Sequence, residues 1–280
     1  MQLLLKINIW IINMNHSNKY YIPTTILGLL SIFTVLFNTE LYDGSWSMIS
    51  MSLFAVAIPI CSYIFRKNAV ISFLLTTFFT IIVVRNADQH DWSIVGWVTA
   101  LVFIPLLCQL ISLARDSYNT DGTHLTALTL LRTFIGLNWL THCTEKLFLS
   151  HHDVGLVDFF SNVVGPNTIG QSIPEPWVHY VIILGGLVEL TAAICLGLGL
   201  LTRFGAFVSC AYLVAAQLMS GHFMVGYTWM IPGGGWEVPF YFFMVTYPFM
   251  LPRNAGSISL DTALKTNNSN IALIKSFSGA

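Results

Sequence analysis

The segment Val178–Leu201 reads VHYVIILGGLVELTAAICLGLGLL and decides the class of the fold. It has at least the roughly 20 apolar residues that a helix needs to cross a ~30 Å hydrocarbon core. Glu189 lies midway along it. A carboxylate at the centre of a spanning helix costs about 2.5–3.5 kcal/mol. The rest of the chain must therefore supply a buried partner, a bound proton or a water-filled cavity, and Glu189 is the first candidate functional residue.

The composition agrees with a membrane protein. Of the 280 residues, 55% are hydrophobic and 9% are charged, and the mean hydropathy is +0.71. Soluble domains carry about 25% charged residues. We therefore do not expect this chain to fold as a soluble globular protein. The formal net charge of −1 gives no indication of a nucleic-acid partner. The lipid bilayer is the partner that this composition predicts.

The cysteines give no indication of a metal site or a redox motif. All five lie in apolar segments and none belongs to a C-x-x-C pair, which is the spacing that zinc sites and dithiol motifs require. We expect them to act as small apolar packing residues. They are Cys61, Cys108, Cys143, Cys195 and Cys210.

Apolar runs of spanning length recur along the chain, and they predict an all-α polytopic membrane protein of about eight transmembrane helices. The expected spans are 21–37, 47–65, 68–85, 93–114, 125–148, 178–201, 204–223 and 236–252. We expect an N-terminal membrane region of about four helices at 1–115, a four-helix membrane domain at 123–262, and a polar cytoplasmic tail at 263–280. Residues 1–15 carry short apolar runs typical of an interfacial segment.

The distribution of cations supports eight spans. With alternating helices, one side of the membrane holds nine Lys and Arg residues and the other holds two, Arg85 and Lys146. Cytoplasmic loops carry the excess of Lys and Arg. The pattern predicts a protein of the plasma (inner) membrane with both termini in the cytoplasm.

The most polar span is 125–148. At 100° per residue, its polar side chains fall within an arc of about 140°, which indicates that they face the protein interior. They are Arg132, Asn138, His142, Glu145 and Lys146. A rise of ~1.5 Å per residue places Arg132 at a depth similar to that of Glu189. We therefore expect an Arg132–Glu189 ion pair, which either joins two helices or carries protons or substrate.

A second group of polar and aromatic residues is expected at the outer end of the bundle. His142 and His222 come to one level there, and Trp236 and Glu237 return to it after the turn PGGG at 232–235. Tryptophans at this depth, Trp229 and Trp236 among them, are first of all expected to be interfacial anchors. The two histidines suit hydrogen bonds to a quinone, proton transfer or haem ligation. His151-His152 lie in the long loop, where we expect them to be solvated.

Four segments of the second half resemble the DoxX family of four-helix membrane proteins over about residues 123–262. They are LRTFIGLNWLTHCTEKLF, VELTAAICLGLGLLTRFGA, GHFMVGYTWMIPGGGWE and NAGSISLD. This family includes the DoxD-type subunit of thiosulfate:quinone oxidoreductase. The resemblance marks a set of positions that largely coincide with those chosen above: Arg132, His142, Lys146, Glu189, Arg203, His222, Trp236 and Glu237.

The resemblance implies a quinone-linked oxidoreductase subunit that acts on a small reduced sulfur compound. The catalytic residues would be His142, Lys146, Glu189 and His222, and the substrate-binding residues would be Arg132, Asn138, Trp236 and Glu237. The sequence contains no flavin fingerprint or haem motif. Either the quinone reacts directly or a partner redox subunit carries the electrons. The alternative is a non-enzymatic membrane carrier or scaffold subunit, for which the unmatched first half of the chain argues.

Overall fold

The computed structural model describes residues 18–225, 235–264 and 271–279, and these contain helices and no strand. The expected all-α class is confirmed. The expected interfacial segment at 1–15, Trp229 and most of the turn at 232–235 lie outside the described residues.

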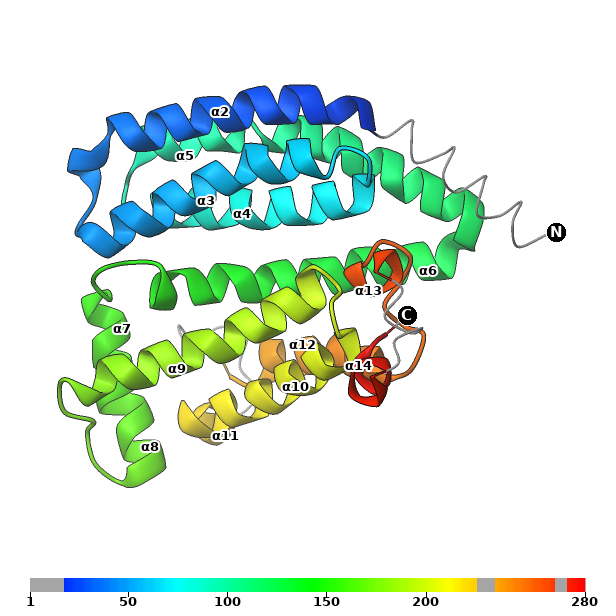
Figure 1. Ribbon diagram of the computed structural model, residues 1–280. Coiled ribbons are helices and arrows are strands. Elements are labelled where there is room, and N and C mark those ends of the chain that lie inside the picture. Colours follow the sequence, from blue (N-terminus) through cyan, green and yellow to red (C-terminus); the bar gives the residue numbers. More distant parts are fainter. Residues whose placement is uncertain (1–17, 226–234, 265–270, 280) are drawn as a thin grey trace.

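The first half of the chain forms a layer of helices that lie side by side (Figure 1). Its helices are η1 (Asn18–Tyr20), α2 (Tyr21–Phe37), η2 (Thr39–Leu41), α3 (Ser45–Ile64), α4 (Ala69–Gln89) and α5 (Ser93–Ala100). After a short connection, Asn68 caps α4, and its side chain accepts a hydrogen bond from the Ile71 amide at 3.1 Å. Such a cap satisfies a free backbone donor in the first turn.

Helix α6 (Phe103–Leu147) joins the two halves. Its backbone breaks at Gly122, where φ is +82°, a conformation that glycine adopts without steric cost. The ribbon turns back at this end of the bundle, so the two parts of α6 belong to different layers (Figure 1). Ser117 and Thr126 share a hydrogen bond of 2.7 Å across the turn. The expected span 93–114 thus covers α5 and the start of the first arm of α6, and the expected span 125–148 is the second arm.

The second layer contains the second arm of α6 together with α9, α10 and α12 (Figure 1). The helices after α6 are α7 (Val154–Phe159), the π-helix η3 (Phe160–Val164), α8 (Gly165–Ile169), α9 (Trp177–Ala192), the π-helix η4 (Ala193–Gly197), α10 (Thr202–Met219), α11 (His222–Val225), α12 (Glu237–Thr246), η5 (Tyr247–Met250), α13 (Leu260–Ala263) and α14 (Ala272–Phe277). Helices α13 and α14 lie at the end of the bundle where α6 turns, and α7 lies at the opposite end.

Five segments are long and apolar enough to cross a membrane, judged by length and composition. They are Ser45–Ile64, Ala69–Gln89, Ser93–Leu147, Trp177–Gly197 and Thr202–Met219, and Tyr21–Phe37 is a shorter apolar helix. Helices stand at all the expected spans, while the count of eight crossings stays a prediction. Large apolar side chains such as Trp97 and Leu53 are exposed on the outside of the bundle, as lipid contact requires.

The two layers share one buried apolar core, which extends from Val35 in α2 to Leu260 in α13. Polar contacts also tie the layers together where α6 ends. The Trp46 indole donates to the Leu147 carbonyl at 2.8 Å, and the Ser50 hydroxyl donates to the Phe148 carbonyl at 2.7 Å. The division into an N-terminal region and a four-helix domain stays a prediction, and the shared core shows that the two parts pack as neighbours.

Candidate functional site

A buried ion pair links α6 to α9. The Lys146 ammonium lies 2.9 Å and 2.8 Å from the two carboxylate oxygens of Glu189. Lys146 is 7% exposed and Glu189 is 5% exposed. A pair removed from water in this way is held only if the remaining donors and acceptors are also satisfied.

The Lys146 side chain meets this requirement. An ammonium group has three N–H donors, and its third hydrogen bond goes to the His142 carbonyl at 3.0 Å. On the other side of the pair, the Tyr212 hydroxyl of α10 donates to Glu189 Oε1 at 3.2 Å. The Trp139 ring packs against the Tyr212 ring with centroids 5.6 Å apart. Three helices therefore hold Glu189 in one position.

Two consecutive glycines of α9 allow this approach. A Cβ atom at Gly186 would lie 2.8 Å from the Lys146 Cβ atom, and one at Gly185 would lie 3.0 Å from the Tyr212 hydroxyl. Farther along the same two helices, Gly136 of α6 lies directly against the backbone of Gly197. Small residues let the backbones of membrane helices come close. The glycines place Glu189 within reach of a lysine on one side and a tyrosine on the other.

The partner of Glu189 is Lys146 and not Arg132, so the expected Arg132–Glu189 ion pair was wrong. The depth estimate assumed that the second arm of α6 ends at the level where α9 begins. Because Gly186 lies against Lys146, the end of α6 instead meets α9 about 13 Å beyond Trp177, at ~1.5 Å per residue. The flexible lysine stem then reaches Glu189 one turn farther along.

Arg132 occupies a separate polar site toward the other end of this arm. It is fully buried, and its Nε atom donates to the Ala255 carbonyl at 2.7 Å. Its other nitrogens donate to the carbonyls of Leu196, Gly197 and Ile258 and to the hydroxyl of the neighbouring Thr133. The last carbonyls of a helix lack partners within it, so Arg132 caps the end of η4. The substrate-binding role expected for Arg132 stays a prediction, and the geometry assigns it a structural one.

A cavity of about 730 Å³ lies beside the ion pair, between the start of α3, the end of α6 and α9. Its polar lining comes from one lysine, three histidines, a serine and a tryptophan, and the described residues that line it include no aspartate or glutamate. The polar lining residues are Trp46, Lys146, Ser150, His151, His152 and His179. Such a lining suits an anion.

His152 and His179 form a hydrogen-bonded pair in the wall of this cavity. Their Nδ1 atoms are 2.9 Å apart and the rings stack with centroids at 5.2 Å. His152 Nε2 lies 3.1 Å from the Lys146 carbonyl, which can only accept, so this nitrogen carries the proton. His152 Nδ1 then accepts from His179. His152 is partly buried rather than fully solvated, because it bridges the loop after α6 to the start of α9.

This contact predicts a pH dependence of stability. Burial lowers the pKa of His152, the hydrogen bond to the Lys146 carbonyl raises it, and His179 and His151 lower it further. Other charged groups facing the pair are Lys146 and Glu175, whose carboxylate is 4.0 Å from His179. Since the folded pKa lies below the unfolded value of about 6.5, the unfolded state binds more protons between the two. The stabilisation is complete above about pH 6.5 and is lost as the pH falls through the folded pKa.

The measurement is thermal unfolding between pH 5 and pH 7.5. His152→Gln should remove part of the loss seen in acid, whereas the exposed His124→Gln should leave the profile unchanged. An unaltered profile in His152→Gln would show that this pair does not control acid stability.

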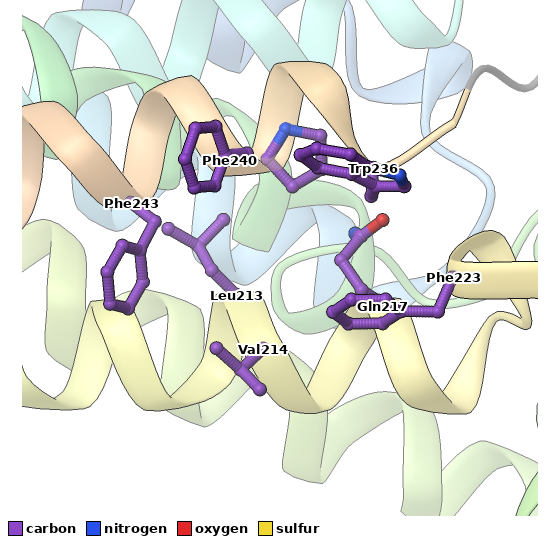
Figure 2. A pocket seen from close by; sticks show the side chains of 8 residues that line it. Leu213, Val214, Gln217, Phe223, Trp236, Phe240 and Phe243 are labelled. Atoms are coloured by element: carbon purple, nitrogen blue, oxygen red, sulfur yellow. The ribbon is translucent and has the colours of Figure 1, made fainter. Parts of the chain in front are cut away.

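The remaining expected residues are more dispersed. His142 is exposed and its ring lies 6.3 Å from that of Trp139, while Asn138 is partly buried on the same helix. His222 begins α11 and is partly exposed, and no contact among the described residues joins it to His142. Trp236 lines a second cavity between α10 and α12 (Figure 2). Glu237 begins α12 and is 2% exposed.

The sequence prediction missed Tyr212, and it noted His152 and His179 without assigning them to the site. Tyr212 carries one hydroxyl on an otherwise apolar side chain, within an apolar helix. Nothing in its position along the sequence distinguishes it from a packing residue. His179 two residues into a spanning helix was the available signal. Among the described residues, no group of three or more His, Cys, Asp or Glu side chains is placed to hold a metal ion.

The helices and the buried ion pair define an all-α integral membrane protein with a polar site inside its second layer. Residues 127–222 match the model of the DoxX family, and this segment includes both Lys146 and Glu189. The match confirms the resemblance noted in the sequence over these residues, and the part of it expected at 223–262 stays a prediction. A search of the curated proteins and a search of the solved structures each gave no match.

Proposed function

We propose that the chain is a quinone-linked oxidoreductase subunit that binds a small reduced sulfur anion in the cavity beside Lys146. The observation that carries this proposal is the cavity lining, in which Lys146 and three histidines face a space without a carboxylate among the described lining residues. Cationic and neutral N–H donors are the groups that bind oxyanions. The DoxX domain supplies the link to quinone, and a partner subunit or the quinone itself carries the electrons.

The ion pair makes anion binding depend on a proton. All three donors of Lys146 are engaged, two of them by Glu189. An anion can therefore reach the ammonium group only if Glu189 releases it. Protonation of Glu189 frees two donors and removes a negative charge from the same space, while Tyr212 keeps the acid in place. Each anion bound at Lys146 should accordingly take up one proton.

The other expected residues have subsidiary roles in this proposal. His142 and His222 would hydrogen-bond the quinone and exchange its protons, with Asn138, Trp236 and Glu237 contacting the substrates. Arg132 supports the helices that hold the ion pair. The charge distribution along the sequence favours the inner membrane, with the termini cytoplasmic and the Lys146 cavity on the outer side.

The test is thiosulfate-dependent reduction of decylubiquinone by the purified protein together with any partner that co-purifies. Lys146→Met should lower the turnover by at least about 100-fold, as loss of a positioned charge does in catalysis, while the exposed Lys67→Met should not change it. A pH-sensitive dye should report proton uptake on thiosulfate binding in the wild type and none in Glu189→Gln. Absence of both binding and turnover in the folded wild type would contradict the proposal.

A non-enzymatic carrier or scaffold is the second candidate, and the closed geometry of the pair favours it. Glu189 is not among the described lining residues of the cavity, and it accepts hydrogen bonds from two neighbouring helices. A carrier predicts thiosulfate uptake by proteoliposomes without added quinone. A scaffold predicts that Glu189→Gln changes stability alone, with neither uptake nor turnover in the wild type.

A further inference from the structure

A second cavity, of about 360 Å³, lies between α10 and α12 and shares no described lining residue with the cavity beside Lys146. Its volume is at the lower end of the range of about 300–1,000 Å³ that is typical of ligand sites. Aromatic and aliphatic side chains line it on both helices (Figure 2). The lining residues are Leu213, Val214, Gln217, Phe223, Trp236, Pro239, Phe240 and Phe243.

Gln217 carries the amide among the described residues of this lining. Its side chain extends from α10 toward Trp236, which directly precedes the facing helix α12 (Figure 2). The residue is 9% exposed, and its Oε1 atom accepts no hydrogen bond among the described residues. Buried polar groups in folded proteins are nearly always hydrogen-bonded. An unpaired amide oxygen in an apolar cavity therefore indicates a ligand that supplies a donor.

We propose that this cavity binds a lipophilic molecule that carries one hydroxyl group, an apolar alcohol or phenol. A hydroxyl both donates and accepts, so it can donate to Gln217 Oε1 and accept from the amide nitrogen. The apolar body fills the space between the rings of Trp236, Phe240 and Phe243. Because the described residues of the lining include no charged side chain, an ionised head group would be buried without a partner among them.

Part of the lining of this cavity reaches the surface of the bundle. Val214 and Phe240, on opposite helices, are 43% and 45% exposed. A lipophilic ligand can therefore enter sideways from the membrane. This inference does not depend on anion binding at Lys146, because the two cavities differ in their described lining residues and in polarity.

The test compares probes that differ in one hydrogen-bond donor. In nanodiscs, binding of 4-butylphenol and of 4-butylanisole is measured by the quenching of tryptophan fluorescence, and 1-octanol and octane form the aliphatic arm. The phenol should bind about tenfold more tightly than the anisole, as one buried hydrogen bond allows. The aliphatic arm shows whether the site prefers a lipid alcohol or an aromatic ring.

Gln217→Leu should bind both aromatic probes with equal affinity, and it corrects for their partition into the bilayer. Gln217→Met serves the same purpose if the leucine variant does not fold. Val214→Trp should fill the cavity and abolish binding of every probe. Equal affinity of the phenol and the anisole for the wild type, or a phenol preference that persists in Gln217→Leu and Gln217→Met, would overturn the proposal.

Discussion

Replacing Lys146 with methionine should lower the free energy of unfolding by about 3–5 kcal/mol, which is the usual cost of removing one partner from a buried ion pair. Glu189 is 5% exposed, so its carboxylate would remain buried with only the Tyr212 hydroxyl as a donor. The protein would respond by binding a proton at Glu189 or by admitting water into the helix contact. Both responses lower the free energy of unfolding relative to that of the wild type.

The double variant Lys146→Met/Glu189→Leu separates the cost of an unpaired charge from the value of the pair. Apolar residues of similar volume can replace a buried ion pair with little loss of stability, so the double variant should recover most of what Lys146→Met loses. Unfolding in mixed micelles with increasing SDS measures the stability of the single and the double variant. The control Lys67→Met, at an exposed lysine, should unfold as the wild type does. A loss below about 1 kcal/mol in Lys146→Met would mean that the pair is solvated, as exposed pairs are.

This experiment also bears on function. If the double variant folds normally and has lost anion binding, the ion pair is retained for its chemistry, since an apolar pair holds α6 and α9 together equally well. If the double variant folds normally and keeps anion binding, Lys146 is not the group that attracts the anion. Stability and binding measured on the same two proteins thus distinguish a structural pair from a functional one.

Most of the helical architecture could be predicted from apolar run lengths. Helix α2 covers Tyr21–Phe37, which is the expected span, and the break at Gly122 falls where the polar stretch 115–124 separates two runs. Hydropathy succeeds here because a segment in lipid must satisfy its backbone hydrogen bonds internally. The end of α12 at Thr246 differs from the expected 252 because Pro248 cannot continue an α-helix and the chain tightens into η5.

The contacts within the site were less predictable. Helix periodicity places Arg132, His142 and Lys146 on one arc, and this identified the polar helix. Helix periodicity contains no information on the axial offset between α9 and α6. That offset decides which cation contacts Glu189. The offset depends on Gly186 and on the loop 148–176, whose length alone does not indicate where α9 begins.

Replacing Arg132 with methionine should have the largest effect of any single change, a loss of about 4 kcal/mol or more, because several buried acceptors lose their donor together. Each unsatisfied buried acceptor costs about 1–3 kcal/mol, and Arg132 donates to carbonyls of Leu196, Gly197, Ala255 and Ile258. The carboxylate of Asp261, which interacts electrostatically with Arg132, would also lose a buried counter-charge. Losses above 4–5 kcal/mol are exceptional for a single substitution. A loss of that size should leave little folded protein.

Arg132→Lys tests whether the shape of the guanidinium matters or only its charge. A lysine keeps the positive charge near Asp261, but its three donors radiate from a single atom and cannot reach carbonyls on both sides of a planar fork. It should recover part of the stability and leave the end of η4 uncapped. The exposed Arg115→Met is the matched control and should unfold as the wild type does. If Arg132→Lys were as stable as the wild type, charge alone would hold this end of the bundle, and the four carbonyls would find other donors.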